Sequence, residues 1–129
     1  MFSISGEDLQ CRVLDCPGGS SSFTATLNTN GGDATAIDPV YALPPHEVAE
    51  MVAAEVARGS AWANANLDRY RWDFYVDPEG HRRIRSESAR IFGDDVVAHP
   101  DRYQPAPLPD LPFPDLAFDL VLCSHLLFT

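Results

Sequence analysis

Two carboxylates and two glycines, at a spacing suited to cofactor binding, are the residues of this sequence that could do chemistry. Asp15 follows a short apolar run and precedes a turn that contains Gly18 and Gly19. Asp38 ends a second apolar run about 20 residues further on. A strand, a glycine-containing turn, a helix and a second strand ending in a carboxylate form the half-site of a nucleotide cofactor, in which that carboxylate holds the ribose.

Each residue type has a physical reason to be there. Glycine at positions 18 and 19 lets the backbone approach a ligand without an intervening Cβ. Asp38 can accept two hydrogen bonds from ribose hydroxyls, and charge makes such bonds strong. The alternative for Asp38 is a carboxylate that caps the next turn, and the alternative for Asp15 is a residue that only orders the loop and the following helix.

The surrounding pattern predicts a βαβ unit that would position these groups. A strand is expected over residues 11–16, ended by the turn at Pro17. A helix is expected from Ser20 or Ser21 to the Gly31-Gly32 pair, followed by a second strand over residues 34–37. A connection of this length favours a right-handed parallel crossover.

Further elements follow along the chain. A helix is predicted from Pro44-Pro45 to near Gly59, with a helical continuation over 61–67 as the alternative, then a turn at 77–80 and a short helix over 82–92. Six prolines in 100–114 exclude a helix or central strand there and leave a strand of two or three residues around Tyr103. The apolar run 118–124 predicts a strand of a parallel sheet that is covered on both faces.

Composition limits the partners. The 129 residues suffice for one domain, and 19 acidic against nine basic residues give a net charge of -10. This charge repels phosphate backbones, so we expect no nucleic-acid partner. We also expect no membrane span, because no apolar run approaches about 20 residues, and the N-terminus lacks a signal-peptide pattern, which indicates a cytoplasmic protein. Three scattered cysteines argue against a disulfide framework or a zinc site.

Taken in order, these pieces resemble the class I S-adenosylmethionine-dependent methyltransferases. In that family the first strand ends in an acidic residue and a glycine-rich turn, as at Asp15 to Gly19, and the second ends in the ribose-binding acid, as at Asp38. The family also has a characteristic segment that leads into its fourth strand. Residues 111–121, Leu-Pro-Phe-Pro-Asp-Leu-Ala-Phe-Asp-Leu-Val, match that segment. The resemblance runs from about Cys11 to the last residue.

The resemblance implies a fold, a cofactor and site residues. The fold is Rossmann-like α/β, a parallel sheet sandwiched by helices, of which residues 1–129 would hold about four strands, in order 3-2-1-4, of the usual seven. The chain would thus be the cofactor-binding half of the domain, truncated after the fourth strand, whose unpaired edge favours a homodimer. S-adenosyl-L-methionine would be held by Asp15, Pro17, Gly18, Gly19, Asp38, Asp110 and Cys123. The acid that holds adenine in the family would stand at the position of Pro107 here, and Asp110 would be its candidate substitute.

His125 is the candidate catalytic residue, because it follows the fourth strand, where the acceptor chemistry of the family is located. It could act as a general base for an oxygen or nitrogen acceptor, line the methyl end of the cofactor, or only pack. The acceptor is expected to be a small molecule. The basic cluster His81-Arg82-Arg83-Ile84-Arg85 with Arg90 predicts a solvated helix face, with a role in shaping an acceptor pocket as the alternative.

Two departures from the glycine-rich pattern of the turn help to distinguish S-adenosylmethionine from NAD(P) as the cofactor. Pro17 stands where the first glycine is usual and Ser21 where the third is. Proline lacks an N–H for a pyrophosphate and serine adds bulk at the helix, which disfavours an NAD(P)-dependent oxidoreductase more than a methyltransferase. The remaining alternative is a non-catalytic Rossmann-like module.

Overall fold

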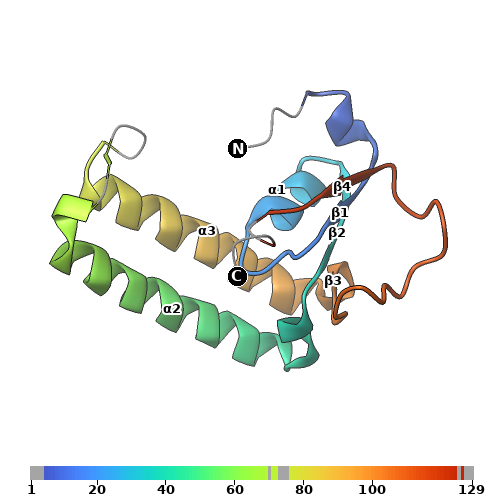
Figure 1. Ribbon diagram of the computed structural model, residues 1–129. Coiled ribbons are helices and arrows are strands. Elements are labelled where there is room, and N and C mark those ends of the chain that lie inside the picture. The colour runs from blue at the N-terminus through green and yellow to red at the C-terminus, as the bar shows by residue number, and fades with distance from the viewer. Residues whose placement is uncertain (1–4, 70, 73–75, 125, 127–129) are drawn as a thin grey trace.

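The computed structural model describes residues 5–69, 71, 72, 76–124 and 126, which form a small α/β structure with one parallel sheet. The four strands stand in the order β3-β2-β1-β4, with β1 paired in parallel to both β2 and β4 (Figure 1). Their bounds are β1 (Arg12–Asp15), β2 (Asp33–Ile37), β3 (Tyr103–Gln104) and β4 (Leu120–Leu122). The predicted incomplete Rossmann-like sheet and its strand order are confirmed.

Three α-helices pack on one face of the sheet: α1 (Phe23–Thr29), α2 (Pro45–Ala65) and α3 (Pro78–Ala98). Leu27 of α1 packs on Val13 and Ala34, while α2 and α3 cover Ala36 and Tyr103. Side chains two residues apart in a strand share a face, so Ala34 and Ala36 place all three helices on the same side. Short 3₁₀ helices lie at η1 (Asp8–Gln10), η2 (Pro39–Ala42), η3 (Leu67–Arg69) and η4 (Pro100–Arg102). None of the described helices has the length and apolarity that a bilayer crossing requires.

The opposite face of the sheet is covered by the proline-rich segment 105–119 rather than by a helix. Leu14 and Ile37 point to this face, where Phe113 and Phe118 of the segment pack against them. The two phenylalanine rings meet edge to face with centroids 4.8 Å apart. The expected short strand near Tyr103 is present, and residues 105–119 have no helix or strand. Residues 100–102, where no helix is expected, form the short 3₁₀ helix η4, because proline fits the first turn of a helix.

Both long helices exceed their predicted bounds. The α2 helix continues through Gly59 to Ala65, so the expected end near this glycine is wrong, and the alternative of a helical continuation beyond residue 61 is observed. The α3 helix begins at Pro78, and Asp77 caps it by accepting a hydrogen bond from the Gly80 N–H at 2.6 Å. The turn expected at 77–80 is therefore the first turn of a helix, since aspartate followed by proline is also a helix start.

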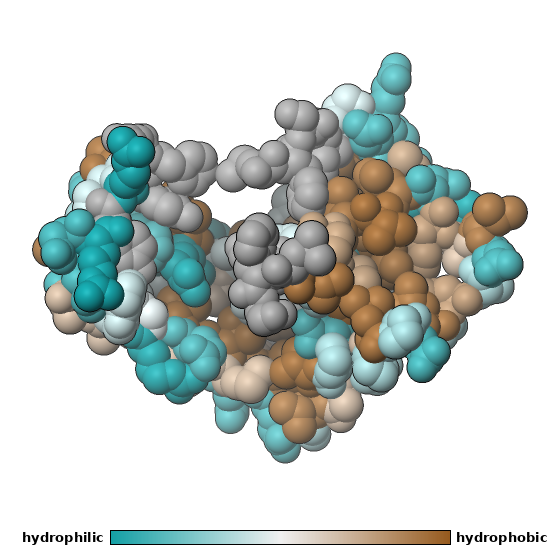
Figure 2. All heavy atoms as spheres, in the orientation of Figure 1, coloured by the Kyte–Doolittle hydropathy of each residue, from teal (hydrophilic) through white to brown (hydrophobic). Residues whose placement is uncertain are grey.

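The β4 strand is shorter and more open than expected. It spans three residues, and the side chain of Val121 is 56 % exposed, so the prediction of burial on both faces is wrong. Only one neighbour, β1, pairs with it among the described residues, which leaves its outer edge free. Apolar side chains gather over β4 and the segment 105–119, where Leu116 and Val121 are exposed (Figure 2).

Candidate cofactor-binding site

A cavity of about 430 Å³ opens at the carboxyl ends of β1 and β4, and we call it the loop cavity. The chain passes from β1 outward through β2 to β3 and returns to place β4 on the other side of β1, so the direction of winding reverses here. Such a switch point is where open parallel sheets bind their ligands. The lining residues are Asp15, Pro17, Gly18, Gly19, Ser20, Ser21, Phe23, Leu122 and Ser124.

Asp15 is the ionisable side chain in this lining. It is the last residue of β1 and is 5 % exposed. Burial raises the pKa of its carboxyl from 3.8 to about 7, and no described residue donates a hydrogen bond that would lower it. A buried carboxylate without a partner is costly, so this cavity favours a ligand that brings positive charge or a hydrogen-bond donor.

Gly18 fits the turn tightly against the neighbouring strand. Its N–H donates to the carbonyl oxygen of Ile37 at 2.8 Å. A Cβ on Gly18 would lie 2.7 Å from both the Cβ of Ala36 and the hydroxyl of Tyr41. Glycine is thus required here for contact between the turn and β2, a reason that the sequence pattern does not reveal.

Both backbone polar groups of Gly19, its N–H and its carbonyl, are hydrogen-bonded. Its φ is +53°, a left-handed conformation that favours glycine. Its N–H donates to Asp38 Oδ2 at 3.2 Å, and its carbonyl accepts from the Tyr41 hydroxyl at 2.7 Å. We call this arrangement the Gly19 clamp. Tyr41 is the member that sequence reasoning missed, because it carries no local motif and meets Gly19 only in the fold.

Asp38 has a second structural task. Its Oδ1 accepts a hydrogen bond from the Val40 N–H at 2.9 Å and so caps η2. Turn capping, the alternative weighed for this residue, is therefore observed. A carboxylate has about four acceptor positions. These two bonds leave capacity for a ribose hydroxyl, and that role stays a prediction.

A smaller apolar cavity of about 140 Å³ adjoins the loop cavity through Pro17, which lines both. Asp38 lies between Ile37 and Pro39, two of the residues in its wall. The lining consists of Cys16, Pro17, Ile37, Pro39, Ala106, Leu108 and Leu126. The turn after β1 thus separates the loop cavity, which holds the Asp15 carboxyl, from a smaller apolar space that has Asp38 beside it.

The fold brings together only part of the predicted site. The loop cavity is lined by Asp15, Pro17, Gly18 and Gly19. Asp38 is connected to this lining by the hydrogen bond that it accepts from the Gly19 N–H. Asp110 and Cys123 are solvent-exposed and belong to neither cavity lining. His125 lies outside the described residues. Sequence reasoning missed Leu122 and Ser124, which lie on either side of Cys123 and do line the loop cavity.

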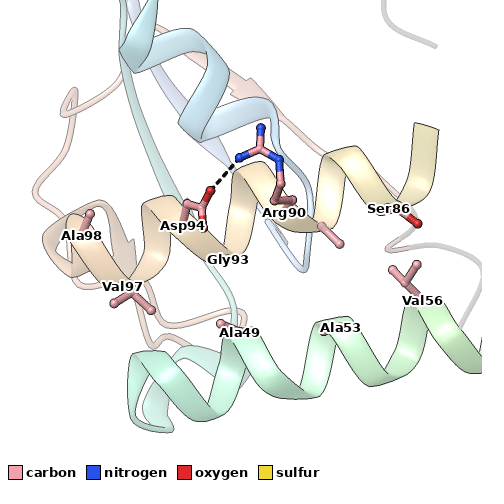
Figure 3. Close-up of a pocket in the computed structure, with 10 residues that line it drawn as sticks. Ala49, Ala53, Val56, Ser86, Arg90, Gly93, Asp94, Val97 and Ala98 are labelled. Carbon is pink, nitrogen blue, oxygen red and sulfur yellow. Dashed lines mark hydrogen bonds and ion pairs between the residues drawn. The ribbon is translucent and has the colours of Figure 1, made fainter. Parts of the chain in front are cut away.

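A larger cavity of about 630 Å³ runs between α2 and α3, away from these groups (Figure 3). Its walls are mainly alanine, glycine and valine side chains. Its two charged residues, Arg90 and Asp94, pair with each other at 2.8 Å. Because these two charges compensate each other within the wall, this cavity offers fewer free polar groups to orient a ligand than the loop cavity does.

Comparisons with known proteins give one relative without an assigned activity. Uncharacterized protein MJ0045 of Methanocaldococcus jannaschii is 27 % identical over 133 residues, covering 98 % of this chain and 58 % of the relative. The chain thus spans a little over half the length of that protein. No protein-family model matches the chain, and no solved structure matches it either.

Proposed function

We propose that this chain is the cofactor-binding part of an S-adenosylmethionine-dependent methyltransferase that acts on a small molecule in the cytoplasm. The observation that carries the proposal is Asp15, a carboxylate buried without a partner among the described residues and facing a cavity at the switch point of the sheet. S-adenosylmethionine has positive charge on its sulfonium and on its amino group. A ligand of this kind would compensate the negative charge of the carboxylate. An uncompensated charge is the main cost of burying such a group.

The neighbouring groups suit the rest of the cofactor. Asp38 has acceptor capacity for ribose hydroxyls, and the apolar cavity beside Ile37 and Pro39 suits a flat base. The Gly19 clamp fixes the turn between the two spaces. The cofactor would supply an already activated methyl group, so the task of these residues is to bind and orient.

The same carboxylate argues against a dinucleotide. A pyrophosphate is anionic, and binding it beside Asp15 would set like charges together in a buried space. Pro17, which lines the loop cavity, offers no N–H to a phosphate. Both features favour a cationic cofactor over NAD(P).

Calorimetric titration of the chain with S-adenosylhomocysteine and with NADH tests this proposal. We expect binding of the first and none of the second. Asp38→Ala should weaken S-adenosylhomocysteine binding at least tenfold, because it removes the ribose acceptor and one bond of the Gly19 clamp. Asp115→Ala, at an exposed position of segment 105–119, is the control and should bind like the parent chain.

The same titrations can refute the assignment. Folding of each sample is checked by circular dichroism. A folded chain that binds neither ligand would leave a non-catalytic α/β module as the account of this protein. Binding of NADH instead would favour the oxidoreductase alternative.

A further inference from the structure

A separate cavity of about 350 Å³ lies between the turn after β1 and the pair of helices α2 and α3. We call it the arginine cavity, because Arg85 is its charged residue. Three hydroxyl side chains and three apolar ones complete its lining, which is Ser20, Ser21, Val56, Ile84, Arg85, Ser88 and Ala89. The volume is in the range of small-molecule sites, about 300–1,000 Å³.

Arg85 has a guanidinium that no described residue neutralises. Two arginines of α3 are paired, Arg82 with Glu79 and Arg90 with both Glu87 and Asp94, whereas neither Arg83 nor Arg85 forms an ion pair with a described residue. Arg85 has no ion pair or hydrogen bond within the described part of the chain, although the protein carries a net charge of -10. Its Nη2 lies over Gly59 of α2, 3.9 Å from where a Cβ would stand, so the side chain reaches across the space between the helices.

The chemistry of this lining fits an organic acid. A guanidinium binds a carboxylate or phosphate through two parallel hydrogen bonds, and the hydroxyls of Ser20 and Ser21 can donate to the same oxygens, whereas the Ser88 hydroxyl donates to Ser22 Oγ at 3.0 Å. Val56, Ile84 and Ala89 provide an apolar wall beside the charge. The complementary ligand is a small acid with an anionic head and a short apolar body.

The arginine cavity and the loop cavity share Ser20 and Ser21. The two spaces therefore meet at the turn after β1, with the carboxyl of Asp15 in one and the guanidinium of Arg85 in the other. We infer that the arginine cavity binds the methyl acceptor and that this acceptor is a small organic acid held by Arg85. The acceptor role depends on the proposed methyltransferase function, whereas the binding of an acid does not.

The carboxylate of S-adenosylmethionine itself is the competing source of an anion. The volume and the apolar wall favour a whole small molecule over one terminal carboxylate. The two sources differ in what a change at Arg85 does. If Arg85 holds the acceptor, Arg85→Gln leaves S-adenosylhomocysteine binding unchanged.

The test uses phenylacetate as the probe and phenylacetamide as its neutral counterpart, both titrated into the full chain labelled with ¹⁵N. We expect phenylacetate to shift the amide resonances of Ser20, Ser21, Ser88 and Ala89, and phenylacetamide to bind at least tenfold more weakly. Arg85→Gln should lower the affinity for phenylacetate at least tenfold. Arg83→Gln is the matched control, because Arg83 is exposed on the same helix and lies outside the cavity lining.

Three results would overturn the inference. One is equal binding of phenylacetate and phenylacetamide, or no binding of either. The second is an equal effect of Arg83→Gln and Arg85→Gln. The third is a tenfold loss of S-adenosylhomocysteine affinity in Arg85→Gln, which would assign the arginine to the cofactor. The proposed function fails by a different result, the absence of S-adenosylhomocysteine binding to the parent chain.

Discussion

At the scale of single residues, Asp15 combines deep burial with an ionisable carboxyl. Its pKa is about 7 in the folded protein against 3.8 when unperturbed, so the folded state holds this proton more tightly than the unfolded chain does. The stability that this group contributes is complete below pH 4 and is lost as the pH rises through 7.

Asp15→Asn should therefore change how stability depends on pH. Asparagine cannot ionise, so between pH 5 and pH 8 the parent should lose about 3 kcal/mol relative to the variant. Urea unfolding of both proteins at pH 5, 6, 7 and 8 measures this difference. Parallel curves for the two proteins would show that the Asp15 carboxyl does not titrate in this range.

Gly18 is where a single methyl group should disturb the site. In Gly18→Ala the new Cβ would meet Ala36 and the Tyr41 hydroxyl at 2.7 Å. Overpacking of this kind costs about 1–3 kcal/mol, which urea unfolding would detect. Gly6→Ala is the control, because nothing lies within 4 Å of a Cβ there, and it should unfold like the parent. Equal stability of the two variants would contradict the packing described for Gly18.

The types of these residues were predictable from the sequence, but their partners were not. The strand, turn and acid pattern identifies Asp15, Gly18 and Asp38 as a group. It does not reveal that Gly18 packs on Ala36 or that Asp38 caps η2, because both contacts depend on how the turn meets β2. Local pattern thus predicts which of these residues lie near one another better than which groups each of them contacts.

At the scale of elements, an ion pair fastens β4 to β1. Arg12 Nε and Nη2 bond to the two carboxylate oxygens of Asp119, each at 2.9 Å. The Arg12 N–H also donates to Asp119 Oδ2 at 3.0 Å, and together these bonds lower the pKa of the Asp119 carboxyl to about 2. Sequence reasoning used Asp119 only as part of a motif. The structure shows that it fixes the strand that forms one wall of the loop cavity.

The Gly19 clamp links η2 to the turn after β1, and Tyr41→Phe tests it. The variant loses the hydrogen bond from the tyrosine hydroxyl to the Gly19 carbonyl. A lost hydrogen bond costs about 1 kcal/mol of stability. Because the turn is then held less firmly, S-adenosylhomocysteine should also bind several-fold more weakly in calorimetry.

Tyr103→Phe is the matched control for Tyr41→Phe. Tyr103 is also buried and donates its hydroxyl proton to Asp95 Oδ2 at 2.7 Å, but it does not contact the turn after β1 through that bond. This variant should lose a similar amount of stability and keep its affinity for S-adenosylhomocysteine. If both variants had the same affinity for S-adenosylhomocysteine, the Gly19 clamp would not contribute to binding.

At the scale of the whole molecule, the sheet order followed from general rules of chain topology. Parallel crossovers are right-handed and consecutive strands tend to be neighbours, so few arrangements of these elements exist. The lengths of α2 and α3 and the covering of the second face were not predictable in this way. They depend on packing between distant segments, such as Phe113 and Phe118 on Leu14 and Ile37.

The free edge of β4 leads to a prediction about assembly. No described strand pairs with this edge, and the edge together with the 56 % exposed Val121 favours pairing with a second copy of the chain. We expect sedimentation equilibrium to show a concentration-dependent dimer that Val121→Glu weakens at least tenfold. Val97→Glu, at a 51 % exposed position on α3, is the control and should dimerise like the parent. A monomer at all concentrations would contradict this prediction.

The most direct test of the central claim is the affinity of the chain for S-adenosylmethionine at pH 6 and pH 8. For a carboxyl with a pKa of about 7, the ionised fraction rises about tenfold over this interval. If Asp15 binds the positive charge of the cofactor, calorimetry should show affinity rising by up to about that factor in the parent chain. Asp15→Asn should bind more weakly and without this pH dependence. Affinity that is the same at both pH values, or an Asp15→Asn variant that binds as tightly as the parent, would contradict the account.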